Sequence, residues 1–278
     1  MSTASVSALR DPLVVVAFSG WNDAGEAASQ VLVHLQEAYD SEPLYELEPD
    51  DFYDFQATRP QVTRPTPDES EISWPSTELS VVHLPDRDLV LVSGPEPNLR
   101  WRAFCAELVS AFRSIDPTLI VILGAMLTDS PHSRPVPVSA TSSDPKLAEQ
   151  IGLPHPDYEG PTGITGVLGD ACRRVGLPVV SLWASVPHYV SSPPNPKATL
   201  ALLTKLEDIL DLSFDPGELP ELSQAWQRGV DELAAEEPEI GEYIAKLEEA
   251  QDEADLPEAS GDVIAAEFMR YLRRQRPS

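Results

Sequence analysis

The sequence has little of what several classes of protein require. Its two cysteines, Cys105 and Cys172, are too few for a disulfide framework, and each lies in an apolar helical stretch that suggests a buried, reduced thiol. No run of about 18 apolar residues is present, so we expect no transmembrane helix. The first residues, MSTASVSALRDP, lack the basic start and apolar core of a signal peptide. Together these absences predict a cytoplasmic protein.

Positive charge is also scarce. The 278 residues include 19 lysines and arginines against 46 aspartates and glutamates, which gives a formal net charge of -27. Such a chain repels the phosphates of nucleic acids and of anionic membrane surfaces, so we expect neither as a partner. The simplest explanation of this acidity is solubility, and the alternative is a partner attracted by charge.

Familiar catalytic and nucleotide-binding motifs are missing. The sequence has no G-x-S-x-G, no H-E-x-x-H and no paired C-x-x-C. The glycine-rich stretch YEGPTGITG at 158–166 lacks the lysine of a Walker phosphate loop. Its glycines also have the wrong spacing for a dinucleotide fingerprint, and they follow a long loop instead of a strand. We therefore assign no catalytic residue, no cofactor and no metal ligand.

Two interpretations of this glycine-rich stretch stay open. In the first, which we favour, small residues let a helix start pack tightly. In the second, Thr162 caps the helix and bare N–H groups near Gly163 face an anion, although Glu159 would oppose that anion.

Strand and helix patterns alternate over the first two hundred residues. This order predicts an α/β fold with a mostly parallel sheet and helices on both faces. LSVVHLP and EISWP suggest a hairpin around Ser76 and Thr77, and a long loop is expected from Leu127 to about Pro161. The other expected strands are 13–20, 44–49, 87–94, 118–126 and 177–187, and the expected helices are 23–38, 98–116, 163–176 and 195–212.

Local signals mark the starts of two helices. Asp23 and Glu26 have the spacing of a capping box before the first helix. Asn195 followed by Pro196 marks the start of the fourth.

The sequence changes character after about Asp215. Three helical patterns follow without strands, and they are strongly acidic. The last, 260–275, carries an apolar stripe and an arginine-rich end. We therefore divide the chain into an α/β domain, 1–215, and an acidic C-terminal helical subdomain, 216–278.

Polar residues gather in the loops that follow the expected parallel strands. Because such loops meet at the carboxyl edge of the sheet, they define a candidate ligand-binding cleft. A metal or acid/base site is conceivable from this set, and the alternative is that these are ordinary loop polar residues. The candidates are Asn22, Asp23, Glu96, Arg100, Asp129, His132, Arg134, Glu159, Thr162, Gly163 and His188.

Long stretches of the chain resemble the proteasome assembly chaperone 2 family in its actinobacterial form. The resemblance rests on FSGWNDAG, SGPEPNLRWRAF, LGAMLTDSPHSRPVPV, YEGPTGITGVLGDAC, SLWASVPHYVSSPPNPKATLALL, WQRGVDELAAEEPEI and DLPEASGDVIAAEFMRYLRRQR, which cover nearly the whole chain. It implies an α/β sandwich similar to purine nucleoside phosphorylases, and homo-oligomers with a trimer as the first expectation. Relatives assist proteasome assembly, and some dock through a hydrophobic-Tyr-X tail. This sequence departs from that tail and ends in RRQRPS.

Two functional hypotheses follow. The first is a non-enzymatic, oligomeric, assembly-chaperone-like binding protein, with proteasome subunits as conceivable partners. The second is an enzyme or binder of a small molecule, nucleoside-like or anionic, that uses the cleft at the carboxyl edge.

Overall fold

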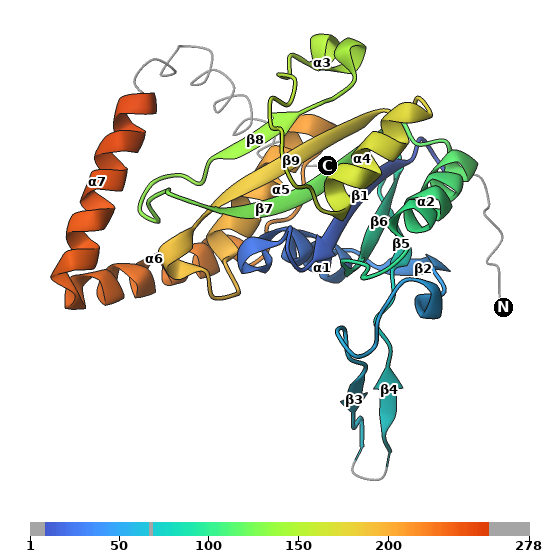
Figure 1. The fold of residues 1–278 in the computed structure, drawn as a ribbon, viewed down its shortest axis with the longest axis horizontal. Helices are drawn as coiled ribbons and strands as arrows, with labels where there is room; N and C mark the ends of the chain where they lie inside the picture. The colour runs from blue at the N-terminus through green and yellow to red at the C-terminus, as the bar shows by residue number, and fades with distance from the viewer. Residues whose placement is uncertain (1–8, 67–68, 256–278) are drawn as a thin grey trace.

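The computed structural model describes residues 9–66 and 69–255, and its centre is a seven-stranded sheet (Figure 1). The strand order is β2-β5-β6-β1-β7-β9-β8, and β3 and β4 form a separate pair. The strands are β1 (Leu13–Ser19), β2 (Ser41–Glu46), β3 (Gln61–Thr63), β4 (Glu71–Ser73), β5 (Glu78–His83), β6 (Asp88–Pro95), β7 (Leu119–Thr128), β8 (Val138–Thr141) and β9 (Val179–Pro187).

The middle of the sheet is parallel and its margins are antiparallel. β6, β1, β7 and β9 run in one direction, with Val14 paired to Val90 on one side and to Ile120 on the other. β5 and β8 run opposite to these four strands, and β2 pairs antiparallel with β5 at the margin. Parallel strands need helical crossovers, which explains the alternating order of elements in the sequence.

Helices cover both faces of the sheet, which confirms the predicted α/β fold. α1 and α5 pack on one face, and α2 and α4 pack on the other. The α-helices are α1 (Ala27–Ala38), α2 (Trp101–Ile115), α3 (Pro145–Ile151), α4 (Ile164–Arg174), α5 (Pro196–Leu210), α6 (Leu219–Glu236) and α7 (Pro238–Asp255). None of them is long and apolar enough to span a membrane, among the residues that the structure describes.

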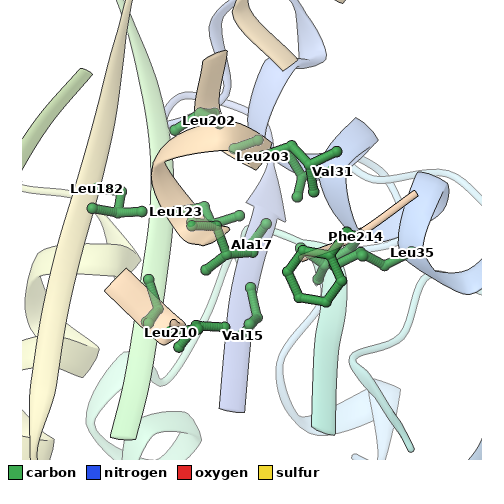
Figure 2. Packing of buried hydrophobic residues seen from close by; sticks show 14 of the residues in the cluster. Val15, Ala17, Val31, Leu35, Leu123, Leu182, Leu202, Leu203, Leu210 and Phe214 are labelled. Atoms are coloured by element: carbon green, nitrogen blue, oxygen red, sulfur yellow. The ribbon is translucent and has the colours of Figure 1, made fainter. Parts of the chain in front are cut away.

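Strand β1 supplies both layers of the core. Val15 and Ala17 face α1 and α5, and Figure 2 shows Val15 near Leu210 of α5 and Ala17 near Leu123 of β7. Val14, Val16 and Phe18 belong to the opposite cluster, with Phe104 of α2 among its members. Residues of β1 are therefore buried on both sides, as expected for a parallel strand between two helix layers.

Helix α5 begins as the sequence predicts. The Asn195 side chain accepts a hydrogen bond from the Ala198 N–H at 3.0 Å, and Pro196 takes the first helical position. Asn195 satisfies one of the free N–H groups at the helix start, while proline there has no N–H to leave unpaired.

The capping box expected for residues 23–26 is wrong. Glu26 adopts a left-handed conformation with φ 55°, and the regular helix α1 starts only at Ala27, after a short 3-10 turn at Ala24–Glu26. The Asp23 carboxylate still caps the helix, but it accepts from the N–H groups of Ala28 and Ser29, at 2.7 and 3.2 Å.

The hairpin expected around Ser76 and Thr77 is also wrong. β4 pairs with β3, which lies upstream, with Val62 opposite Ile72. β5 instead inserts between β2 and β6 in the main sheet. The strand expected at 44–49 starts and ends earlier, at Ser41–Glu46.

The long loop expected at 127–161 contains two further elements. β8 adds an edge strand to β9, and α3 follows it, with Asp144 as its N-cap. Beyond residue 215, α6 packs against α5, and α7 follows α6. The helix expected at 260–275 lies outside the described residues. The division of the chain at residue 215 stays a prediction.

We predict that Leu35→Ala lowers the free energy of unfolding by about 2–5 kcal/mol, because the Leu35 side chain on α1 is fully buried in the core. Val33 lies on the same helix but is exposed, so Val33→Ala changes stability by no more than about 0.5 kcal/mol. Urea unfolding of both variants tests this. Equal losses for the two would contradict the placement of α1.

Candidate functional site at the carboxyl edge of the sheet

The four parallel strands end at one edge of the sheet, as the sequence predicts. β1 ends at Ser19, β6 at Pro95, β7 at Thr128 and β9 at Pro187. β7 and β9 continue past the end of β1, since their pairing runs to Thr128 and Pro187 while β1 pairs with β7 only as far as Ile122. This stagger divides the candidate residues into two separate clusters.

The first cluster joins the end of β1 to the start of α4. Asn22 donates from Nδ2 to Glu96 Oε1 at 2.8 Å, and the same oxygen accepts the Ile164 N–H at 2.9 Å. Thr165 donates to Asn22 Oδ1 at 3.2 Å. The N-terminus of α4 favours a negative charge, and the chain's own Glu96 supplies it.

The glycine at the start of α4 is required by close approach. Gly163 has φ -94°, which any residue can adopt. A Cβ atom there would lie 2.8 Å from Asn22 Cγ, closer than side chains tolerate. The expectation that Thr162 caps α4 is wrong, because Gly163 is the N-cap residue, and Glu96 accepts the Ile164 N–H. The geometry thus supports tight packing, and an outside anion would have to displace Glu96.

Beside this cluster, Asp23 accepts hydrogen bonds from the first turn of α1. It is buried, and its carboxylate accepts from Ala28 N, Ser29 N and Ser29 Oγ. Burial raises its pKa above the ordinary range, and the bonds from Ser29 and Ala28 oppose that shift. Its oxygens are occupied in holding the first turn of α1.

The second cluster centres on His132, in the loop after β7. His132 is almost fully buried, with Nδ1 2.8 Å from the Tyr189 hydroxyl and Nε2 2.9 Å from Asp231 Oδ1. The Tyr189 hydroxyl also accepts the His132 N–H at 2.8 Å. Lys197 donates to the His132 carbonyl and to Gln227. The turn after β9, α5 and α6 therefore all contact His132.

Aromatic rings extend the second cluster towards α7. His188 packs edge-to-face on Tyr189 and Tyr243, with ring centroids 5.8 and 5.7 Å apart. Asp129 lies 3.2 Å from His188 Nδ1 and accepts the Tyr243 hydroxyl at 3.3 Å. His188 thus contacts Tyr189, its neighbour in the turn after β9, and Tyr243 of α7.

Arg134 links the loop after β7 to α7. Its guanidinium forms two hydrogen bonds to the Asp252 carboxylate, both 2.7 Å, and lies 3.5 Å from Glu248. Ser133 also donates to Glu248. The Arg134 hydrogen bond holds the pKa of Asp252 below its ordinary value. Two-pronged arginine–carboxylate contacts of this kind fix geometry as well as charge.

Two candidates lie apart from both clusters. Arg100 pairs with Asp51 and sits over the Phe52 ring, 5.8 Å from its centroid. Glu159 is exposed in the loop before α4. The structure therefore does not bring all eleven candidates into one cleft, and their functional role stays a prediction.

The sequence analysis did not identify several residues that complete the clusters, among them Thr165, Tyr189 and Asp231. Thr165 follows the glycine loop and Tyr189 follows His188, so proximity to the candidates was a usable signal for both. Asp231 is one of many acids on α6, and nothing in the local sequence distinguishes it.

Burial raises the pKa of one tyrosine in the second cluster and of both cysteines in the core. Burial raises the pKa of Tyr189 to about 12, so its hydroxyl stays protonated at neutral pH. Burial likewise raises the pKa of the Cys105 and Cys172 thiols to about 12, which makes them poor nucleophiles. Within residues 9–66 and 69–255, no three His, Cys, Asp or Glu side chains are placed to hold a metal ion.

Apolar side chains are exposed at the same edge. Trp21 follows β1, Leu99 follows β6, and Met126 and Leu127 end β7, with 69, 46, 43 and 51% of each exposed. The edge therefore combines satisfied polar groups with uncovered apolar surface, as protein-binding surfaces do.

Comparison with known proteins identifies the family. The PAC2 family model matches residues 17–234. The chain belongs to the PAC2 family. This confirms the resemblance drawn from the sequence. A search of curated proteins found no match.

Solved structures of PAC2 relatives support this assignment. A PAC2 family protein from Streptomyces avermitilis is 53% identical, with a TM-score of 0.79 over 84% of this chain and 99% of that one. A proteasome-assembly chaperone homologue from Mycobacterium tuberculosis is 46% identical, with a TM-score of 0.76 over 84% and 99%. An archaeal homologue of proteasome-assembly chaperone from Pyrococcus furiosus, 13% identical, shares the fold with a TM-score of 0.59 over 89% and 98%.

We predict that Gly163→Ala lowers the free energy of unfolding by about 1–3 kcal/mol, because the new methyl group displaces Asn22 from Glu96. Gly169→Ala is the matched control on the same helix. Its methyl group meets only Ile122 Cδ1, at 3.7 Å, so a gain of up to about 1 kcal/mol is expected. Thermal and urea unfolding measure both, and a neutral Gly163→Ala would show that the contact with Asn22 is dispensable.

We also predict that α7 loosens in acid. The pKa of Asp252 is lower in the folded chain than in the unfolded chain. The Arg134–Asp252 contact therefore contributes its full stabilisation of α7 at pH values above the ordinary aspartate pKa of about 3.9. That stabilisation is lost as the pH falls through the lowered pKa of Asp252. Hydrogen exchange of residues 248–255, corrected for intrinsic rates, should rise at low pH while residues 202–206 of α5 stay protected.

Arg134→Met should produce the same faster exchange at neutral pH. Arg113→Met is the control, because Arg113 is an exposed arginine on α2, away from α7. Unchanged exchange in Arg134→Met would contradict a role for this arginine in holding α7.

Proposed function

We propose that this chain is an assembly-chaperone-like binding protein whose partner is another protein. Membership of the PAC2 family supports this role. The observation that carries it is the 46% identity to a proteasome-assembly chaperone homologue, over 84% of this chain. Proteasome core subunits are therefore the first partners to test.

The carboxyl edge is the proposed binding surface. Trp21, Met126 and Leu127 offer exposed apolar area, and tryptophan is among the residues that contribute most strongly to protein interfaces. Glu96 and His132 are already bonded within the chain, so they hold this surface in shape. A preformed surface binds with little cost of ordering.

We further propose that the protein acts in the cytoplasm as a homo-oligomer, with three copies as the first expectation. Two reduced, buried thiols suit a reducing compartment. The oligomer is also motivated by exposed apolar side chains elsewhere on the molecule, among them Val62, Ile72 and Leu233.

The test uses the full chain and purified proteasome core subunits from the same organism. We expect the protein to bind unassembled subunits and to change the rate at which core particles form, followed by native gels and peptidase activity. Trp21→Ala should weaken binding by about tenfold or more, because a few residues, often tryptophans, contribute most of the binding free energy of an interface. Val33→Ala, an exposed apolar residue on α1, is the control and should bind normally.

Two results would count against this function. One is the absence of any binding to core subunits, together with an unchanged assembly rate. The other is turnover of nucleosides, esters or peptides by the purified protein at ordinary enzyme rates.

The alternative function, binding of a small molecule, has the polar cluster of buried Asn22 and Thr165 with half-buried Glu96 in its favour. A thermal-shift screen of nucleosides, phosphate and divalent metals tests it. A ligand at one hundred times its dissociation constant adds about 2.7 kcal/mol of stability. A stabilising ligand whose effect disappears in Glu96→Gln would favour this alternative.

A further inference from the structure

Exposed apolar side chains gather at the carboxyl edge of the sheet. Trp21 follows β1, Leu99 follows β6, and Met126 and Leu127 belong to the end of β7. β6, β1 and β7 are consecutive strands of the sheet, so these side chains come from neighbouring positions along one edge. Removing this apolar surface from water is favourable, which favours a segment that covers it.

The loops after these three strands are acidic. With histidine counted as neutral, residues 20–26, 96–100 and 129–134 carry four acids against the two bases Arg100 and Arg134. The acids are Asp23, Glu26, Glu96 and Asp129. Both bases are already paired, Arg100 with Asp51 and Arg134 with Asp252. Lys197, which reaches the third loop from α5, interacts with the charge of Asp231 on α6. A positively charged covering segment is therefore favoured over an acidic one.

The sequence supplies such a segment in residues 256–278, which lie outside the described part of the chain. The helix expected at 260–275 carries an apolar stripe at helical spacing, made of Ile264, Phe268, Tyr271 and Leu272. Residues 268–278 contain four arginines and no acid, and the three acids of the segment all precede Phe268. The segment therefore combines apolar side chains with positive charge, in a chain whose net charge is -27.

The segment also begins close to the edge. α7 runs beside the loop after β7 (Figure 1), where Tyr243 donates to Asp129 and Arg134 donates to Asp252. Residue 256 follows α7 directly after Asp255. Because the connection within the chain is short, the edge and the segment meet at an effective concentration on the order of 1 mM. A contact that would be weak between separate molecules is then closed most of the time.

We propose that residues 264–276 pack on the carboxyl edge of the same chain. The apolar stripe covers Trp21, Met126 and Leu127, and the arginines face the acids of the edge loops. An arginine guanidinium over the Trp21 ring adds a cation–π contact. The segment then covers the surface proposed above for partner binding, so a protein partner must displace it. This regulatory role rests on the proposed function, whereas the contact itself does not.

The test is hydroxyl-radical footprinting of the full chain, in which mass spectrometry measures how fast each side chain is oxidised. Phe268→Asp places a charge in the apolar stripe and should raise the oxidation rates of Trp21 and Met126 by about threefold or more, because the closed contact is lost. Ala266→Asp adds the same charge on the opposite side of the expected helix and should keep the wild-type rates. Trp74, which is exposed after β4, is the internal reference and should not change.

The contribution of charge is tested with two matched double variants. Arg273→Gln combined with Arg274→Gln should also raise the oxidation rate of Trp21, because two of the arginines that face the acids are lost. Arg173→Gln combined with Arg174→Gln removes the same charge from the exposed end of α4 and should leave that rate unchanged. The first double variant keeps the proposal testable if the aspartate in the stripe prevents folding, which far-ultraviolet circular dichroism checks.

Equal oxidation of Trp21 in the wild type and in both segment variants would overturn the proposal. Protection of Leu222 and Leu233 on α6 instead would also overturn it, as would protection of Trp21 that is lost on dilution, since the segment would then lie on another surface or on a second copy. Binding of core subunits reports separately on the regulatory role. Phe268→Asp should bind them about threefold more tightly than the wild type, because a larger fraction of the protein has an open edge. Absence of binding by both proteins would count against the proposed function and not against the contact.

Discussion

The burial of β1 on both faces is the constraint on which the structure depends. Parallel neighbours bond it on either side, and Val14, Val15, Val16 and Ala17 are fully covered by helices above and below. The chain can therefore reach the surface only after the end of β1, at Ser19. The polypeptide must turn there within a few residues, which brings Asn22 and Asp23 against β7 and the start of α4. The geometry of the carboxyl edge follows from this exit.

The sequence predicts those helices and strands whose signals lie within their own residues. The continuous apolar runs of β1, β7 and β9 identify strands, and Asn195 with Pro196 marks the start of α5. The partner of a short strand is not a local property. Ile72 has the alternating pattern of a strand, but its side chain is exposed and its partner Val62 lies ten residues upstream, so no buried face fixed the pairing in advance.

The candidate site shows the same limit. Topology predicts that the loops after β1, β6, β7 and β9 gather at one edge, and they do. Which side chains touch depends on elements far along the chain. His132 meets Asp231, 99 positions away, and Arg134 meets Asp252, 118 positions away. Each acid is one of many on α6 and α7, and only the packing of these helices on the loop after β7 selects it.

The contact of Glu96 with the start of α4 has a consequence for how such a chain can vary in length. The carboxylate reaches Ile164 N from the end of β6, while Asn22 fills the space that Gly163 leaves. The loops that carry Asn22, Glu96 and Gly163 therefore have fixed lengths. An inserted residue in any of them would separate the start of α4 from the Glu96 carboxylate. β3 and β4 pair only with each other and outside the main sheet, so this hairpin can lengthen or shorten without moving a core residue. Length differences between homologous chains should accumulate in the hairpin of β3 and β4, and engineered insertions are best placed there.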